Sequence, residues 1–134
     1  MILVDAGPLV AFVDRRDKHH GACVKAFHEL REPLGTVWPA LTEAMYLLAD
    51  LPPGQEAVWD ILERGAVRIL SLDRGDVPRI RELMKKYADR QMDMADAALV
   101  RVAEREGLRR VFTVDRADFS VYRLAGGRRL ALLP

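Results

Sequence analysis

Four acidic residues stand where a carboxylate could do chemistry, and they are Asp5, Glu43, Asp96 and Asp115. Asp5 and Asp115 each follow directly after a short apolar run that predicts a buried strand. If these two strands are neighbours and parallel, both carboxylates emerge at the edge of the sheet where α/β proteins bind their ligands. An acid after a strand can also cap the next helix, so each position alone leaves two interpretations open.

Asp96 lies on a predicted helix and shares a face with Leu99, Val100 and Ala103, the side expected to pack on the sheet. A carboxylate buried there must be paired, protonated or bound to a metal. Asp93, three residues earlier, has the simpler interpretation of an N-cap whose side chain accepts a free N–H of the first turn. The position of Asp96 therefore favours a function.

Glu43 lies four residues before Leu47 on another predicted helix, which places it at the edge of the apolar side. Several carboxylates gathered in one pocket repel each other, so the set predicts a cation among them. Oxygen ligands select hard ions such as Mg²⁺, with Mn²⁺ as a substitute, and no cysteine or histidine cluster offers a zinc site. Such an ion can polarise a phosphoryl oxygen, and phosphodiester hydrolysis fits that capacity.

Short strands alternate with helices along the chain. Apolar and β-branched runs predict strands over residues 2–5, 36–38, 66–72, 110–114 and 129–133. Helical spacing and end signals predict helices over residues 8–13, 17–31, 39–51, 55–64, 78–88 and 94–106. Strands separated by helices predict an α/β fold: one domain over residues 1–134, with a central, mostly parallel sheet flanked by helices on both faces.

Length and composition fit a globular protein, with 134 residues of which half are apolar. The 21 basic and 20 acidic residues nearly balance, so charge neither indicates nor excludes a nucleic-acid partner. No apolar run reaches the length needed to cross a bilayer, and the start of the chain does not look like a signal peptide, so a cytoplasmic protein without a membrane partner is expected. The single cysteine, Cys23, is expected to be a small buried hydrophobe.

Four segments of the chain resemble PIN-domain ribonucleases in their order and spacing. They are MILVD (1–5), LTEA (41–44), MDMADAAL (92–99) and FTVDRADF (112–119). The small size resembles that of the VapC-type toxins of toxin–antitoxin pairs, and the resemblance covers essentially the whole chain. One departure is the Ala6-Gly7-Pro8 segment, because many family members carry Ser or Thr directly after the first acid.

The resemblance implies a metal-dependent endoribonuclease that a small antitoxin protein holds inactive, with RNA as the substrate. The family's acidic site falls on Asp5, Glu43, Asp96 and Asp115, where Asp5, Asp96 and Asp115 hold the metal directly or through water. Glu43 would bind the metal or orient the attacking water. Accessory positions are Asp93, Asp118 and Thr113, and Arg116 is a candidate RNA contact because it follows Asp115.

The same resemblance implies a homodimer. The apolar residues Tyr46, Leu51 and Trp59 are candidates for such an interface, and core packing is the alternative for them.

Two other readings of the chain stay open. One is a phosphotransfer domain of the receiver or phosphatase kind, but a phosphatase would want an acid two residues after Asp5, where Gly7 stands, and a receiver would want a late lysine, which is absent after Lys86. The other is a catalytically silent PIN fold that only binds RNA or protein. The presence of all four acids argues against that loss of activity.

Overall fold

The computed structural model describes all 134 residues, and its centre is a five-stranded parallel sheet. The strands are β1 (Ile2–Val4), β2 (Leu34–Thr36), β3 (Val67–Ile69), β4 (Arg110–Phe112) and β5 (Ala131–Leu133). Their order across the sheet is β3-β2-β1-β4-β5, and all four neighbouring pairs are parallel. The N-terminal strand therefore lies in the middle, with β4 directly beside it.

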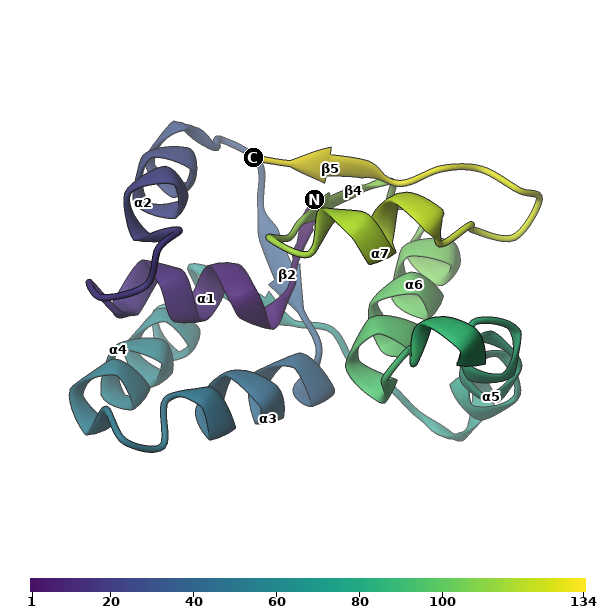
Figure 1. The fold of residues 1–134 in the computed structure, drawn as a ribbon, viewed down its shortest axis with the longest axis horizontal. Coiled ribbons are helices and arrows are strands. Elements are labelled where there is room, and N and C mark those ends of the chain that lie inside the picture. Colours follow the sequence, from purple (N-terminus) through teal and green to yellow (C-terminus); the bar gives the residue numbers. More distant parts are fainter.

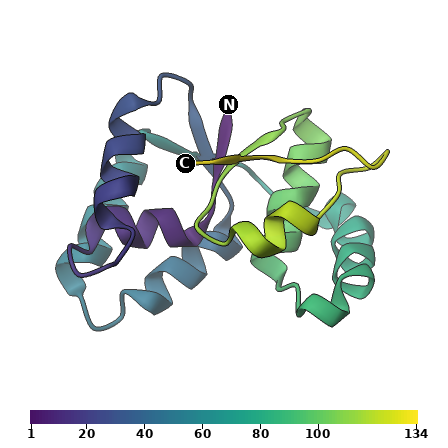
Figure 2. The same cartoon turned by 45° about the horizontal axis from the view of Figure 1, so that its top comes forward.

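Seven α-helices and two short 3₁₀ helices surround the sheet. They are α1 (Ala6–Val13), α2 (His20–Glu29), α3 (Trp38–Leu47), α4 (Pro52–Glu63), η1 (Arg74–Asp76), α5 (Val77–Lys86), η2 (Ala88–Arg90), α6 (Met94–Glu106) and α7 (Arg116–Val121). Helices α1 to α4 gather on one side of the sheet and α5 to α7 on the other (Figure 1 and Figure 2). None of these helices is both long and apolar enough to span a membrane. The predicted α/β architecture with helices on both faces is confirmed.

Alternation along the strands builds a separate apolar core on each face. In β1, Ile2 and Val4 point to the side of α1, together with Phe112 of β4. Leu3 and Val111 point to the opposite side, against α6. Both cores exclude water completely at these five positions, so the sheet is buried on both faces, as parallel sheets usually are.

Helix α3 lies beside both α1 and α6 and so joins the two halves of the molecule (Figure 1). One part of it contributes Ala40 to the core on the α6 side, and the next contributes Leu41 and Ala44 to the core on the α1 side. Glu43 is carried between these contacts, so the packing of α3 fixes its position relative to both layers.

Several predicted boundaries were wrong by a few residues, mostly at prolines. The second strand ends at Thr36, and Trp38 is the first residue of α3 rather than part of a strand. Helix α1 begins before Pro8, and α4 begins at Pro52, because proline is tolerated in the first turn of a helix. The short helix α7 was not predicted at all.

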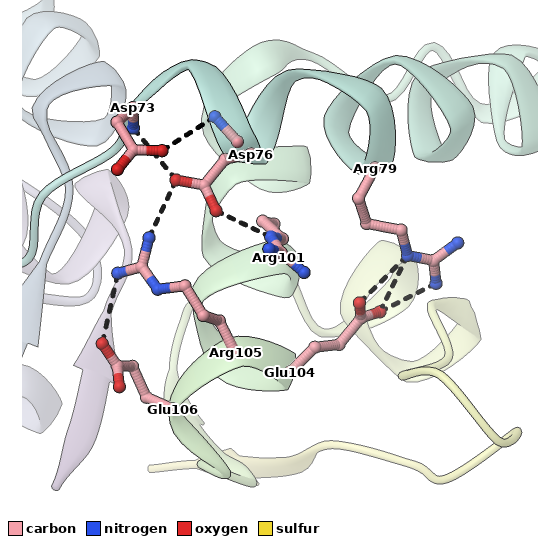
Figure 3. Close-up of polar contacts among 8 residues, drawn as sticks. Asp73, Asp76, Arg79, Arg101, Glu104, Arg105 and Glu106 are labelled. Atoms are coloured by element: carbon pink, nitrogen blue, oxygen red, sulfur yellow. Dashed lines mark hydrogen bonds and ion pairs between the residues drawn. The ribbon is translucent and has the colours of Figure 1, made fainter.

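An ion-pair network, which we call the Asp76 cluster, joins α5 to the carboxyl-terminal half of α6 (Figure 3). Its members are Asp73, Asp76, Arg79, Arg101, Glu104 and Arg105. The buried Asp76 carboxylate receives Arg101 Nε at 2.7 Å and Arg105 Nη1 at 2.8 Å. One turn along α5, Arg79 donates to the Glu104 carboxylate through Nε and Nη2. The cluster thereby holds α6 at a fixed height along α5.

Candidate active site

The structure brings the four predicted acids to the carboxyl edge of the sheet from four different segments. Asp5 follows β1, Asp115 follows β4, Glu43 lies on α3 and Asp96 lies in the first turn of α6. Two further acids border them, Asp93 as the N-cap of α6 and Asp118 in the first turn of α7. We call these six residues the acid cluster.

Asp5 is the most deeply buried member, with 7% of its surface exposed. Its Oδ1 accepts the N–H of Ala6 at 2.8 Å, and its Oδ2 accepts the hydroxyl of Thr113 at 2.9 Å. Burial, together with the charges of Asp93 and Asp115, raises the pKa of Asp5 to about 6 despite these two hydrogen bonds. The chain thus orients this carboxylate without giving it a cation.

Thr113 joins the ends of β1 and β4. Its buried hydroxyl donates to Asp5 and accepts the N–H of Asp115 at 3.0 Å. The pairing of β1 with β4 places these groups together, with Val4 opposite Phe112. The hydroxyl therefore stands between the first and last acids of the set.

Asp96 is half-buried, and its carboxylate is held by one hydroxyl. Its Oδ2 accepts the hydroxyl of Tyr122 at 2.8 Å, while its N–H donates to Asp93 Oδ1 at 2.9 Å. Burial and then the charge of Asp5 raise the pKa of Asp96 to about 8, against the lowering effect of the hydrogen bond from Tyr122. This carboxylate is held in place by a neutral donor only.

Glu43 is also half-buried, and it interacts with the other acids through charge alone. Burial raises its pKa to about 7, and the charges of Asp5, Asp93 and Asp115 add to the shift. The reasoning that placed it beside a buried Leu47 was wrong, because Leu47 is 51% exposed. The residues that bury this face of α3 are Leu41, Ala44 and Leu48.

Asp115 caps α7 by accepting the N–H of Asp118 at 3.3 Å. Its pKa is raised, mainly by burial and also by the charges of Asp118 and Asp93. The Asp118 carboxylate itself turns to Arg90, whose Nη1 lies 3.0 Å from its Oδ1. Arg116, expected near the site, instead donates to the backbone carbonyl of Pro134.

The sequence analysis missed two side chains that contact the acid cluster. Tyr122 is fully buried, and its ring packs edge-to-face on Tyr87 and Phe119. Arg90 closes the 3₁₀ turn before α6. Tyr122 follows Phe119 by three residues, a spacing that would have pointed to it had α7 been predicted.

The donor set suits a hard divalent cation. All ligand candidates are carboxylate oxygens, which Mg²⁺ and Mn²⁺ prefer. The charges of Asp5, Asp93 and Asp115 raise the pKa of neighbouring acids, and a cation would relieve that repulsion. As the side chains stand, no three of them lie close enough together to hold a metal ion. An ion such as Mg²⁺, which keeps several of its waters, would need only few direct carboxylates.

A shallow apolar groove opens beside Glu43, between α3 and the start of α6. It has a volume of about 740 Å³, and Trp38, Tyr46, Leu47 and Met94 line it along with Glu43 and Asp93. These four apolar side chains are all at least half exposed. The acid cluster therefore borders an apolar surface that lacks a partner in the single chain.

Comparison with known proteins finds relatives that are similar over most or all of the chain. Ribonuclease VapC26 of Mycobacterium tuberculosis is 27% identical over 135 residues, which cover 99% of this chain and all of that protein. Mycobacterium tuberculosis VapC20, a toxin that cleaves the sarcin-ricin loop, is 19% identical with a TM-score of 0.79, over 87% of this chain and 91% of its own. A toxin–antitoxin complex from Klebsiella pneumoniae is 13% identical with a TM-score of 0.68, over 100% of this chain and 97% of that one.

The sequence model of the PIN domain matches residues 2–124. That range contains every member of the acid cluster together with Thr113 and Tyr122. The chain belongs to the PIN-domain family.

Proposed function

We propose that the protein is a divalent-metal-dependent endoribonuclease of the VapC type, the cytoplasmic toxin of a toxin–antitoxin pair. The observation that carries this proposal is the gathering of Asp5, Glu43, Asp96 and Asp115 at one sheet edge, without a cation paired to any of them. Membership in the PIN-domain family and the similarity to ribonuclease VapC26 support it.

Asp5, Asp96 and Asp115 are the residues that would hold the ion, directly or through water. Thr113 and Tyr122 orient two of these carboxylates through hydrogen bonds of 2.9 and 2.8 Å, so both donors act as supports for ligands. Mg²⁺, with Mn²⁺ as a substitute, would supply the positive charge that polarises the phosphate and offsets the repulsion among the acids.

Glu43 is suited to accept the proton of the attacking water. The Glu43 carboxylate is half-buried beside the other acids and has no hydrogen-bond partner in the chain, so its oxygens are free to accept that proton. The water oxygen bonds to phosphorus as the bond from phosphorus to the leaving ribose oxygen breaks. Asp93 and Asp118 stay outside the set of direct ligands, because Asp93 caps α6 and Asp118 is paired with Arg90.

The test is cleavage of a mixed RNA pool by the purified protein with Mg²⁺ or Mn²⁺. Chelation and Asp96→Asn serve as controls, and calorimetry of the metal reports on the site without RNA. Cleavage that requires the ion and disappears in the variant supports the proposal. If the protein neither cleaves RNA nor binds the metal, the proposal is contradicted and the silent binding module is favoured.

The groove beside Glu43 is our proposed seat for part of the antitoxin, because the apolar side chains there need a partner of similar character. Of the residues considered for a homodimer, Tyr46 and Trp59 are 79% and 43% exposed and stay candidates. Leu51 is partly buried against the core on the α1 side and is the weakest of the three. Light scattering of the free protein tests the dimer, and co-expression with the candidate antitoxin tests the complex.

A further inference from the structure

Arg90 is the single cation that the chain pairs with the acid cluster. Its Nη1 lies 3.0 Å from Asp118 Oδ1, and no other member of the cluster forms an ion pair. Acids that serve structure are normally paired, as Asp76 is with Arg101 and Arg105. A lone arginine among unpaired acids therefore needs an explanation.

The backbone places Arg90 at the rim of the site. It ends η2 three residues before Asp93, and Gln91 next to it adopts a left-handed conformation with φ of 55°, which turns the chain toward α6. Its partner Asp118 donates its N–H to Asp115. The guanidinium thus bridges the starts of α6 and α7, the two helices that carry Asp93, Asp96 and Asp118.

Most N–H groups of the Arg90 guanidinium have no hydrogen-bond acceptor in the chain. Nη1 is its one hydrogen-bonding atom, so Nε and Nη2 have no protein partner, and the side chain is 38% exposed. A guanidinium presents paired N–H groups that match two oxygens of a phosphate. RNA brings such phosphates to a site whose own charge is strongly negative and repels them.

We propose that Arg90 binds a phosphate of the RNA strand beside the scissile one, and that Asp118 holds the guanidinium in place until RNA arrives. The inference rests on the proposed function. It replaces the expectation for Arg116, whose side chain reaches the carbonyl of Pro134 and not the acid cluster. Asp118 then acts as a positioning residue that competes with RNA for Arg90.

The experiment compares Arg90→Ala and Arg90→Lys with Arg81→Ala, a matched loss of charge on the exposed side of α5 that forms no ion pair. Steady-state cleavage of the mixed RNA pool gives kcat and KM. Fluorescence anisotropy, in an inactive Asp5→Asn background with Mg²⁺ present, gives the affinity for a fluorescein-labelled, randomised single-stranded RNA over a series of KCl concentrations.

For Arg90→Ala we expect KM to rise about tenfold while kcat changes less than about twofold, because the lost contact is made in both ground and transition states. The slope of log affinity against log salt should fall in magnitude by about 0.7, as expected for one phosphate contact to a single strand. Arg90→Lys should keep that slope and lose part of the affinity. Asp118→Asn, which frees the guanidinium, should tighten RNA binding.

Unchanged KM and salt slope in Arg90→Ala, or no RNA binding by any variant, would overturn the inference. A structural role for Arg90 would lower the unfolding midpoint without altering the salt slope. The two proposals can fail separately. If RNA is cleaved equally well without Arg90, the nuclease proposal stands and the Arg90 contact is rejected. If RNA binds through Arg90 in a salt-dependent way but is not cleaved, the Arg90 contact stands and the nuclease proposal is rejected.

Discussion

The two ends of α6 carry acidic residues in opposite electrostatic states. Near its start, Asp96 lies among other carboxylates, and burial and their charges raise its pKa to about 8. Against its other half, Asp76 is only 1% exposed, yet its pKa is lowered by hydrogen bonds from the Asp73 N–H and Arg101 and by the charge of Arg105. The two carboxylates differ in their partners: Asp76 has two arginines, whereas Asp96 has a single neutral hydroxyl donor.

This comparison separates acids that stabilise the fold from acids that are available for chemistry. The Asp76 cluster pairs each buried carboxylate with guanidinium groups (Figure 3). The acid cluster supplies Asp5 and Asp96 with neutral hydroxyl donors only. Perturbed pKa values of this second kind are typical of functional sites.

The largest effect is expected from Asp96→Asn. Loss of one ligand charge should reduce RNA cleavage at least about a hundredfold, as does loss of groups that hold a catalytic metal. Stability without metal should hold near neutral pH, where a pKa of about 8 keeps Asp96 mostly uncharged. It should rise at higher pH, where the variant removes a half-buried charge that lacks a cation. Cleavage rates test the loss of activity, and urea midpoints test the stability. A variant that cleaves RNA at the normal rate would show that Asp96 is not a catalytic residue.

Asp76→Ala should have the opposite effects: a loss of stability and little change at the metal site. It deprives Arg101 and Arg105 of their shared partner, so we expect a loss of about 2 kcal/mol in the free energy of unfolding, discounted because both arginines stay partly hydrated. Metal affinity should change little below the melting transition. The matched control is Glu82→Ala, an exposed partner of Arg79 whose removal should cost less than about 0.5 kcal/mol.

Tyr122→Phe sharpens the comparison by removing only the neutral donor to Asp96. The ring keeps its packing on Tyr87 and Phe119, so stability should change little. Affinity for Mn²⁺, measured by calorimetry, should weaken about tenfold because the carboxylate loses the group that orients it. Equal Mn²⁺ affinity in the two proteins would show that the hydroxyl serves packing alone.

The smallest effect is expected from pH on the metal-free protein. The folded pKa values of Asp5, Glu43 and Asp96 are raised to about 6, 7 and 8, so the native state binds more protons than the unfolded state at neutral pH. Stability due to these groups should therefore be highest below their ordinary pKa values and should fall as pH rises through the neutral range. The pKa of Asp76 is lowered, so its contribution to the free energy of unfolding should be lost only as pH falls below the ordinary pKa of an aspartate.

Urea denaturation across this pH range, with and without Mg²⁺, measures the effect. Added Mg²⁺ should flatten the pH dependence, because bound cation favours the charged carboxylates. A metal-free protein whose stability rises through the neutral range would contradict the raised pKa values.

The order of elements and the positions of the four main acids were predictable from sequence because both are local patterns. Apolar runs ending in Asp5 and Asp115 were sufficient to place two carboxylates at one sheet edge, and the structure pairs β1 with β4 as that prediction required. The cap role of Asp93 also followed from local spacing, and the structure shows it.

What sequence could not supply were contacts between distant segments. Helix α7 has six residues, too few for a clear apolar period, so neither Tyr122 nor its bond to Asp96 could be foreseen. The pairing of Arg90 with Asp118 joins residues 28 apart through a turn that no local pattern predicts. The interpretation of Glu43 relied on Leu47, which tertiary packing leaves exposed.

The central place of β1 also bears on when the protein becomes active during its synthesis. The hydrogen bond between Thr113 and Asp5 spans 108 residues, and Leu3 pairs with Val111. Ribosomes release the N-terminal part of a chain first, so Asp5 emerges long before the strand that completes its surroundings. A chain still being translated lacks Thr113, Asp115 and Asp118 until β4 and α7 emerge, so the acid cluster is complete only late in synthesis.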